Sequence, residues 1–193
     1  MLALPPAPAP AARRQLFVGT AIACTAGATL MGGMLALWLK FRTDAKAGPD
    51  GRWLPKGISI PEVASNIMLL SFIAVCVFAQ WAVWSAKRND RGHTVFALGI
   101  TILTALLIVN AQAYIYHEMD MGIADGTYQV MFYAITGMFL GMMIVGILFS
   151  LVTAFRFTGG RTGDREIVAA HAIYWYTTAA VFTALWFVVY VTK

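Results

Sequence analysis

Residues 130–154 read VMFYAITGMFLGMMIVGILFSLVTA and contain no Asp, Glu, Lys or Arg. An uncharged apolar run of this length can cross the roughly 30 Å hydrocarbon core of a bilayer as a single helix. Its apolar residues follow one another without the alternation of a half-buried strand. Four further uncharged runs have the same character: 16–39, 63–86, 94–116 and 167–191. The sequence therefore predicts an all-α integral membrane protein, a bundle of five transmembrane helices.

The composition of the whole chain agrees with a membrane location. Apolar residues make up 60% of the 193 residues and charged residues 12%, against roughly 25% charged residues in an average soluble domain. A soluble domain of this length has too little interior to bury so many apolar side chains. The net charge of +5 does not indicate a nucleic-acid partner, because the Lys and Arg residues lie at the ends of the apolar runs.

The charged connections predict the orientation of the chain. Eight basic and three acidic residues fall on the side of the N-terminus, and six of each fall on the other side. The positive-inside rule therefore places the N-terminus in the cytoplasm. We expect residues 1–15, rich in Pro and Ala, to form a short cytoplasmic segment without a cleaved signal peptide. Residues 16–193 are expected to form a single transmembrane domain.

The two connections on the outer side differ in character. Turn signals at Gly48–Gly51 and Leu54–Gly57 predict a loop over residues 40–62, closed by Trp53 at the membrane interface. The connection 117–127 carries three acidic residues and no Lys or Arg, and it is expected to form a small acidic patch.

The predicted spans offer few groups for chemistry. Because they contain no carboxylate, Lys or Arg, a proton relay or ion pathway is not indicated. We expect His93, His117 and His171 to lie at span ends and to meet water and headgroups. The segment His117–Met121 mixes hard and soft metal ligands, which favours a solvated loop over a metal site. We predict no catalytic residue, and no metal or cofactor bound by this chain.

Small and polar residues within the runs are the more informative feature. Small residues four apart form ridges along which helices can approach backbone to backbone. The candidates for such packing are Gly19, Ala23, Gly27, Gly32, Gly137 and Gly141. Polar side chains within a span need partners in the low dielectric, so interhelical hydrogen bonds are expected at several of them. These are Asn66, Gln80, Asn110, Gln112, Thr136, Thr177 and Thr178. The pattern predicts a packing or binding subunit rather than a catalyst.

Short motifs occur in a fixed order along the five runs. They are Val18-Gly19-Thr20, Trp53 and Pro55, Asn66, Leu70-Ser71, Ala86-Lys87-Arg88-Asn89-Asp90, Ala111-Gln112-Ala113-Tyr114-x-Tyr116, Phe132-Tyr133-x-x-Thr136-Gly137 and Tyr174-Trp175. In this order and spacing the chain resembles subunit III of the haem-copper cytochrome c oxidases, in its short bacterial form with five spans. The resemblance marks Asn66, Gln112, Tyr114, Tyr174 and Trp175 as candidate intramembrane polar contacts.

The chain departs from the family at its usual ionisable positions. Neutral residues stand where the family has an acid in the first span, a glutamate in the third, two histidines in the fourth, and a histidine and an aspartate in the fifth. They are Gly27, Ile115, Phe139, Met142, Tyr176 and Ala179. Any titration at these positions is therefore put in doubt, whereas the packing framework is retained.

The resemblance implies an accessory subunit of a respiratory oxidase in the bacterial inner membrane. Its partners would be oxidase subunit I, which holds the haems and one copper, and subunit II, which holds the other copper. The chain itself would bind phospholipid and no redox group. Two alternatives stay open: a subunit-III-like accessory protein of another membrane enzyme, such as a nitric oxide reductase, and a stand-alone transporter.

Overall fold

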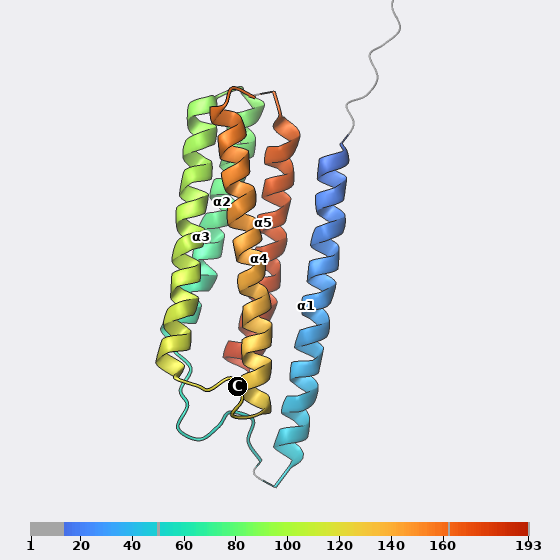
Figure 1. Ribbon diagram of the computed structural model, residues 1–193, viewed down its shortest axis with the longest axis vertical. Coiled ribbons are helices and arrows are strands. Elements are labelled where there is room, and N and C mark those ends of the chain that lie inside the picture. The colour runs from blue at the N-terminus through green and yellow to red at the C-terminus, as the bar shows by residue number, and fades with distance from the viewer. Residues whose placement is uncertain (1–13, 50, 162, 193) are drawn as a thin grey trace, which may run out of the picture.

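The chain forms five long helices that run alternately up and down, as the computed structural model in Figure 1 shows for residues 14–49, 51–161 and 163–192. These are α1 (Gln15–Ala47), α2 (Glu62–Lys87), α3 (Arg91–Met119), α4 (Thr127–Thr158) and α5 (Arg165–Leu185), which continues as the π-helical segment η1 (Trp186–Val191). With η1 counted in α5, all five are long and apolar enough to cross a membrane. The predicted all-α five-helix fold is confirmed.

The helices extend beyond the apolar runs that predicted them. The clearest case is α1, which continues past Leu39 to Ala47 through several charged residues. Charge does not end a helix whose side chains can reach water, and Lys40 and Asp44, four residues apart, form an exposed ion pair at 2.8 Å. Of the predicted N-terminal segment, residues 1–13 lie outside the described residues.

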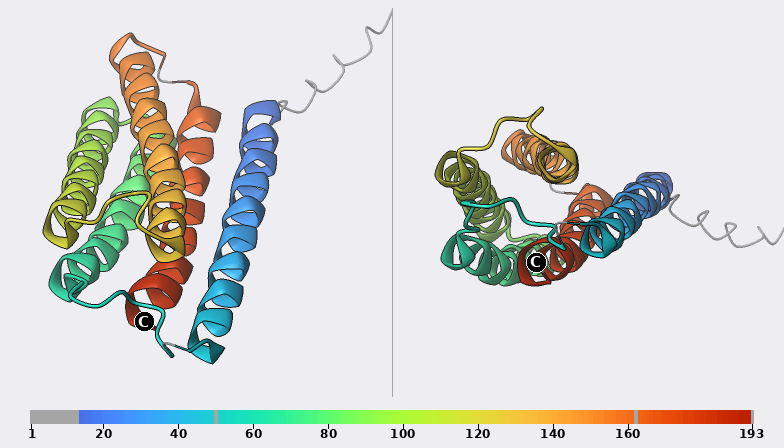
Figure 2. Two further views of the ribbon diagram at one scale, coloured as in Figure 1. Left: turned by 60° about the horizontal axis from the view of Figure 1, so that its bottom comes forward. Right: turned by 90° about the horizontal axis from the view of Figure 1, so that it is seen from below.

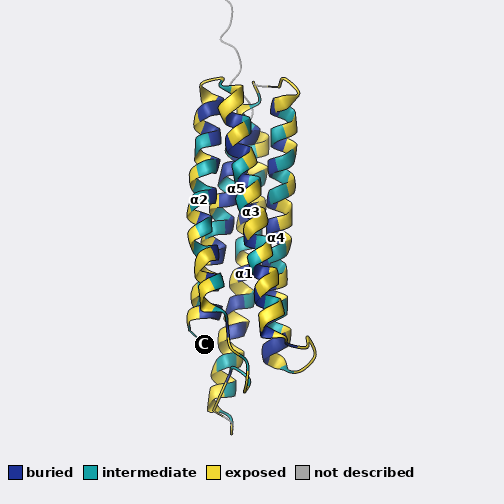
Figure 3. Ribbon diagram, turned by 90° about the vertical axis from the view of Figure 1, so that its left-hand side faces the viewer, coloured by how far each residue is buried: buried dark blue, intermediate teal, exposed yellow. Residues whose placement is uncertain are grey.

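Helices α2 to α5 form a four-helix group, and α1 lies beside it against α5 (Figure 2). The sequence of α1 explains this position, because only Cys24, Met31, Leu35 and Trp38 of this long helix are buried. Most of its remaining surface is apolar or small and meets no other helix of the chain. The buried core lies mainly within the group of four, and Met31, Leu35 and Trp38 of α1 join it from one side (Figure 3).

Three phenylalanines fill the centre of the four-helix group. The ring centroid of Phe182 in α5 lies 4.9 Å from that of Phe72 in α2 and 4.9 Å from that of Phe139 in α4. All three side chains are buried. Aromatic rings at these separations supply both apolar burial and favourable ring–ring contact. This cluster ties three helices together at one level.

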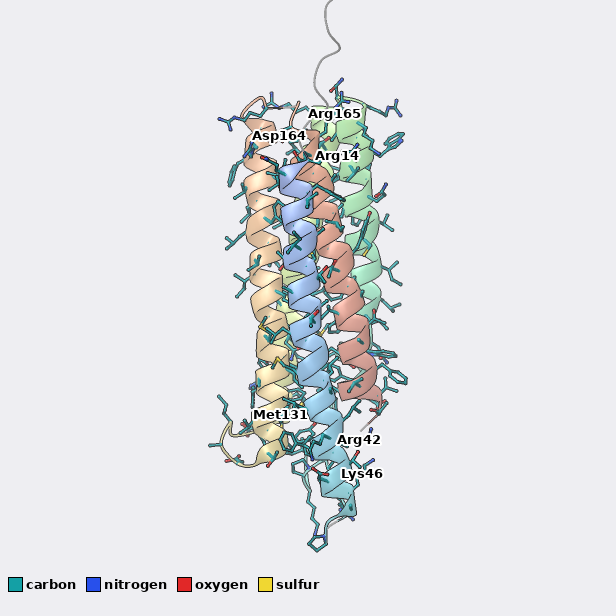
Figure 4. All side chains as sticks on the ribbon, turned by 90° about the vertical axis from the view of Figure 1, so that its right-hand side faces the viewer. Arg14, Arg42, Lys46, Met131, Asp164 and Arg165 are labelled. Atoms are coloured by element: carbon teal, nitrogen blue, oxygen red, sulfur yellow. The ribbon has the colours of Figure 1, made fainter. Side chains whose placement is uncertain are left out.

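Charged residues gather at the two ends of the bundle (Figure 4). At the N-terminal end, which carries Arg14, Asp164 and Arg165, the Arg165 guanidinium donates to Asn89 Oδ1 at 2.9 Å. At the same end, Glu166 of α5 accepts a hydrogen bond from the backbone N–H of Phe17 at 2.9 Å. The carboxylate thereby caps the first turn of α1, where it also meets the positive end of the helix dipole. This contact fixes one end of the peripheral helix.

The turn between α2 and α3 is built from Asn89 and Asp90. Asn89 adopts the left-handed conformation, with φ 58°, which Asn tolerates better than most residues. Asp90 is the N-cap of α3 and accepts from the backbone N–H of His93 at 3.1 Å. That hydrogen bond, supported by the His93 side chain, lowers the pKa of the Asp90 carboxyl.

Asp90→Ala is expected to lower the thermal unfolding temperature near pH 7, because it leaves the first backbone N–H groups of α3 without their cap. A carboxylate with a lowered pKa stabilises the fold above its unfolded pKa, and this stabilisation is lost as the pH falls through the folded value. The difference between variant and parent should therefore shrink as the pH falls below the ordinary Asp pKa of about 3.9 and through the lowered pKa of Asp90. Thermal scans in detergent at neutral and acid pH check this, and a difference that does not shrink in acid would contradict it.

Candidate functional site

The described residues contain no group of three or more His, Cys, Asp or Glu side chains that could hold a metal ion. The segment His117–Met121 is organised instead by local hydrogen bonds. Tyr133 donates to the backbone carbonyl of Met121 at 2.9 Å, and Asp125 accepts from the backbone N–H of Gly122 at 2.9 Å. Polar side chains also form contacts between the helices, and some helix faces stay open to other molecules.

One polar cluster is buried between α4 and α5. The indole N–H of Trp175 points at both Ser150 Oγ and His171 Nε2, each at 3.0 Å, and those two atoms lie 2.8 Å apart. The Ser150 hydroxyl also bonds to the carbonyl of Gly146 at 2.8 Å.

The expectation of an interfacial His171 is wrong. Its side chain is fully buried, whereas His93 and His117 are exposed as expected. The distance of a residue from the end of its span indicates how deep it lies in the membrane. Whether its side chain faces the surroundings or the other helices depends on how the helix is rotated about its axis. Here the rotation turns His171 toward Ser150 and Trp175, which hold it by hydrogen bonds.

Two further hydrogen bonds join the π-helical end of α5 to its neighbours. Trp186 donates from its indole to Asn66 Oδ1 of α2 at 3.0 Å. Tyr190 donates from its hydroxyl to Gln112 Oε1 of α3 at 3.0 Å, and both side chains are buried. Trp186 and Tyr190 both lie in the π-helical segment η1, and their side chains reach the amides of Asn66 and Gln112. The sequence predicted that Asn66 and Gln112 form contacts within the membrane, but it did not indicate that Trp186 and Tyr190 are their partners.

Tyr190→Phe is expected to destabilise the bundle by about 1 kcal/mol. The change removes the hydroxyl and leaves Gln112 Oε1 buried without a donor, beside an Nε2 that already has no partner among the described residues. Unfolding by SDS titration in mixed micelles measures this loss.

Tyr176→Phe is the matched control. The Tyr176 hydroxyl also donates to a glutamine, Gln80, but in exposed surroundings. Its loss should cost clearly less, and equal costs for the two variants would show that burial is not the source of the effect.

The two remaining marked tyrosines behave differently from each other. Tyr174 of α5 donates to the backbone carbonyl of Met142 in α4 at 2.7 Å. Tyr114 of α3 is half exposed and lines an open pocket beside α2. Only Tyr174 therefore joins two helices of this chain.

Several positions that the resemblance associates with ionisable groups lie among apolar side chains, although Tyr176 donates a hydrogen bond to Gln80. Phe139 belongs to the central phenylalanine cluster, and Ile115 is fully buried. A Cβ atom at Gly27 of α1 would lie 3.9 Å from Met142 Cε of α4. Gly27 and Met142 thus face each other between α1 and α4. Because both are neutral where the family has ionisable residues, this contact carries no charge on either side.

The glycines of the helices differ in how much space the rest of the described chain leaves beside them. A Cβ atom at Gly19, Gly32, Gly137 or Gly141 would meet nothing within 4 Å among the described residues. At Gly146 it would lie 2.9 Å from two ring atoms of Trp175 and 3.0 Å from Tyr174 Cε1. Gly146 was not among the marked glycines, although Ser150 stands four positions after it as a second small residue. Of the marked glycines, Gly19, Gly32, Gly137 and Gly141 are exposed and form outward surfaces of α1 and α4.

Comparison with known proteins places this architecture in one family. The family described as "Cytochrome c oxidase subunit III" matches residues 43–193. A relative from Rickettsia bellii named "Probable cytochrome c oxidase subunit 3" is 32% identical over 61% of this chain and 42% of its own length.

Two further relatives agree with this match. One of the same name from Rickettsia conorii is 28% identical over 93% of this chain and 68% of its own. The "Cytochrome c oxidase subunit 3" of Bos taurus is 29% identical over 79% of this chain and 61% of its own. The chain spans 42% to 68% of the length of these three relatives. It is a multi-pass membrane protein, and it belongs to the cytochrome c oxidase subunit III family.

Proposed function

We propose that this chain is a non-catalytic subunit III of a haem-copper cytochrome c oxidase complex in a bacterial inner membrane, with its N-terminus in the cytoplasm. It packs against subunit I, holds phospholipid, and supports assembly of the complex and proton uptake. The family match over residues 43–193 supports the assignment. The excess of basic residues at the N-terminal end supports the orientation.

The observation that carries the packing role is the open small-residue surface of α1 and α4. Gly19, Ala23 and Gly32 of α1 are exposed, and so are Gly137 and Gly141 of α4. At each of these glycines a Cβ atom would meet nothing within 4 Å among the residues that the structure describes. Within a membrane such surfaces allow a second protein's helix to approach the backbone closely, and close packing is a main source of helix association there.

The redox groups belong to the partners in this proposal. The described residues offer no cluster of ligating side chains that fits a copper centre, and His171, the buried histidine, already has both Ser150 and Trp175 beside its Nε2. We therefore assign no redox step to this chain. Since Gly27 and Met142 carry no titratable group, its support of proton uptake is structural.

Purification of the tagged chain from its native membrane in mild detergent tests the proposal. We expect reduced-minus-oxidised haem bands in the visible spectrum, and subunits I and II among the polypeptides identified by mass spectrometry. A colourless preparation that lacks both subunits would overturn the oxidase assignment. Reductase subunits in their place would favour an accessory role in a nitric oxide reductase.

Gly32→Leu and Gly141→Leu test the packing surface. Each should leave the isolated chain at least as stable as the parent, because leucine has a higher helix propensity than glycine and a Cβ atom there meets nothing within 4 Å among the described residues. Each should lower the recovery of subunit I several-fold, because it keeps the partner helix at a distance. Gly99→Leu is the matched control: Gly99 is an equally open glycine on α3. The packing proposal fails if all three variants recover subunit I equally.

A further inference from the structure

A pocket of about 620 Å³ opens between α2 and α3 at the end of the bundle opposite the N-terminal end. The loop residues Gly57–Pro61 close it at that end. The first turns of α2 form one wall, and the last turns of α3, down to Asn110, form the other. Figure 3 shows the outward faces of these two helices side by side and largely exposed.

Three polar side chains on the outward face of α3 line this pocket. Asn110, Tyr114 and Glu118 are spaced four residues apart, so they lie above one another on one face of the helix. All three are exposed, and within the described part of the chain none of them has a recorded hydrogen bond. Asn110 lies about 13 Å along the helix axis from Met119, the last residue of α3. An amide at such depth is costly against hydrocarbon alone, so a polar partner is expected there.

The character of the groove changes along its length. Glu118 and Glu62 lie near the mouth, at the ends of α3 and α2. The wall formed by α2 is apolar along the pocket, with Val63 and Ile67 lining it. On α3, beyond Asn110, the outward face continues with the exposed side chains of Leu107 and Leu103. Along α3 the groove therefore runs from a carboxylate, through a phenol and an amide, to aliphatic side chains.

This gradient matches an amphiphile with a cationic head. Glu118 can accept from an ammonium group, and the Asn110 amide and the Tyr114 hydroxyl can donate to phosphate or ester oxygens. The pocket is confined to the first turns of α2 and the last turns of α3. A partner's transmembrane helix would require a groove along the whole length of both helices, so the dimensions favour a lipid.

We propose that this pocket binds one phospholipid with a primary ammonium headgroup and selects it over lipids with anionic or quaternary ammonium heads. The selectivity comes from the Glu118 carboxylate, which repels an anionic head and accepts hydrogen bonds that a quaternary ammonium cannot donate. This inference deepens the lipid-holding part of the proposed function and rests on it.

Lipid retention by the intact complex tests the proposal. The complex that contains the full chain is reconstituted in vesicles of equal parts phosphatidylethanolamine, phosphatidylcholine and phosphatidylglycerol. It is then extracted in mild detergent, and the retained lipids are quantified by mass spectrometry. We expect phosphatidylethanolamine to be enriched about fivefold over each of the others, as one charge-assisted hydrogen bond at a partly exposed site would give.

Two variants link this enrichment to the pocket. Glu118→Gln should bring the ratios close to those of the vesicles, and Asp120→Asn should leave them unchanged. Asp120 is a matched control, because it is an acidic residue of the same connection that does not line the pocket. A photoreactive residue at position 63, where the parent Val63 is exposed and lines the pocket, should cross-link to lipid.

The outcomes separate this proposal from the broader one. Retention of all three lipids in equal amounts would overturn headgroup selection and leave the lipid-holding role standing. Retention of no phospholipid would overturn both. Equal effects of Glu118→Gln and Asp120→Asn, or cross-linking of position 63 to a polypeptide, would overturn the pocket as the site.

Discussion

Gly146→Leu is expected to prevent the chain from reaching its folded bundle, and Gly146→Ala to destabilise it measurably. A Cβ atom at this position of α4 would lie 2.9 Å from Cζ2 and Cη2 of Trp175, well inside van der Waals contact. Trp175 cannot easily move away, because its ring is fully buried and its indole N–H is hydrogen-bonded to Ser150 and His171. Overpacking of this kind costs about 1–3 kcal/mol for small additions and more for large ones.

Gly137→Ala and Gly141→Ala are the controls on the same helix. Both positions are open within the chain, so alanine should stabilise α4 by up to about 1 kcal/mol through its higher helix propensity. SDS titration of the isolated chain, followed by tryptophan fluorescence, measures all four variants. The predicted signs are opposite at position 146 and at the two controls. A stabilising effect of Gly146→Ala would show that α4 and α5 are not in close contact.

The contrast among these glycines shows which features the sequence could predict. Gly137 and Gly141 form a Gly-x-x-x-Gly pair, and this spacing predicted a packing surface. It could not indicate which helix the surface meets, and in the described part of the chain a Cβ atom at either glycine has no neighbour within 4 Å. The close approach at Gly146 depends on the rotation of α4 against a bulky residue of α5, and no single-helix pattern contains that information.

The five helices themselves could be predicted, because each apolar run has to satisfy its backbone within the bilayer. Their ends could not. Lys40 and Asp44 end the apolar run after Leu39, but they continue α1 by pairing with each other in water. The burial of His171 likewise follows from helix rotation and from partners on another helix, neither of which is visible in local sequence.

The same limit applies to the loop that joins α1 and α2. Its turn signals predicted an irregular segment, and Trp53 was expected at the membrane interface. In the structure Trp53 is buried, with its ring centroid 5.0 Å from that of Trp38 in α1 and 5.4 Å from that of Tyr128 at the start of α4. Trp38 and Tyr128 lie 5.2 Å apart. These three rings hold the loop, α1 and α4 together at the end of the bundle opposite the N-terminal end.

Trp38→Ala should therefore cost about 3–5 kcal/mol, the largest loss expected from any single truncation in α1. The ring is almost completely buried, and its removal opens a cavity between the other two rings. Because α1 has few other buried residues, the loss should concentrate there. SDS titration measures the overall loss, and limited proteolysis of the loop 48–61 measures its local part.

Trp84→Ala is the matched control for Trp38→Ala. Trp84 is 54% exposed, and its main recorded contact is with the Arg88 guanidinium, 4.4 Å from the ring centroid. Truncation there should cost less than about 1 kcal/mol and leave the loop resistant to protease. If both variants lose the same stability, the three-ring cluster does not anchor α1. If Trp38→Ala alone exposes the loop to cleavage, the peripheral helix is held at this end by the cluster and at the other by Glu166. Because α1 is then fixed at both ends, its outward surface of small residues is held in a position where a partner helix can pack against it.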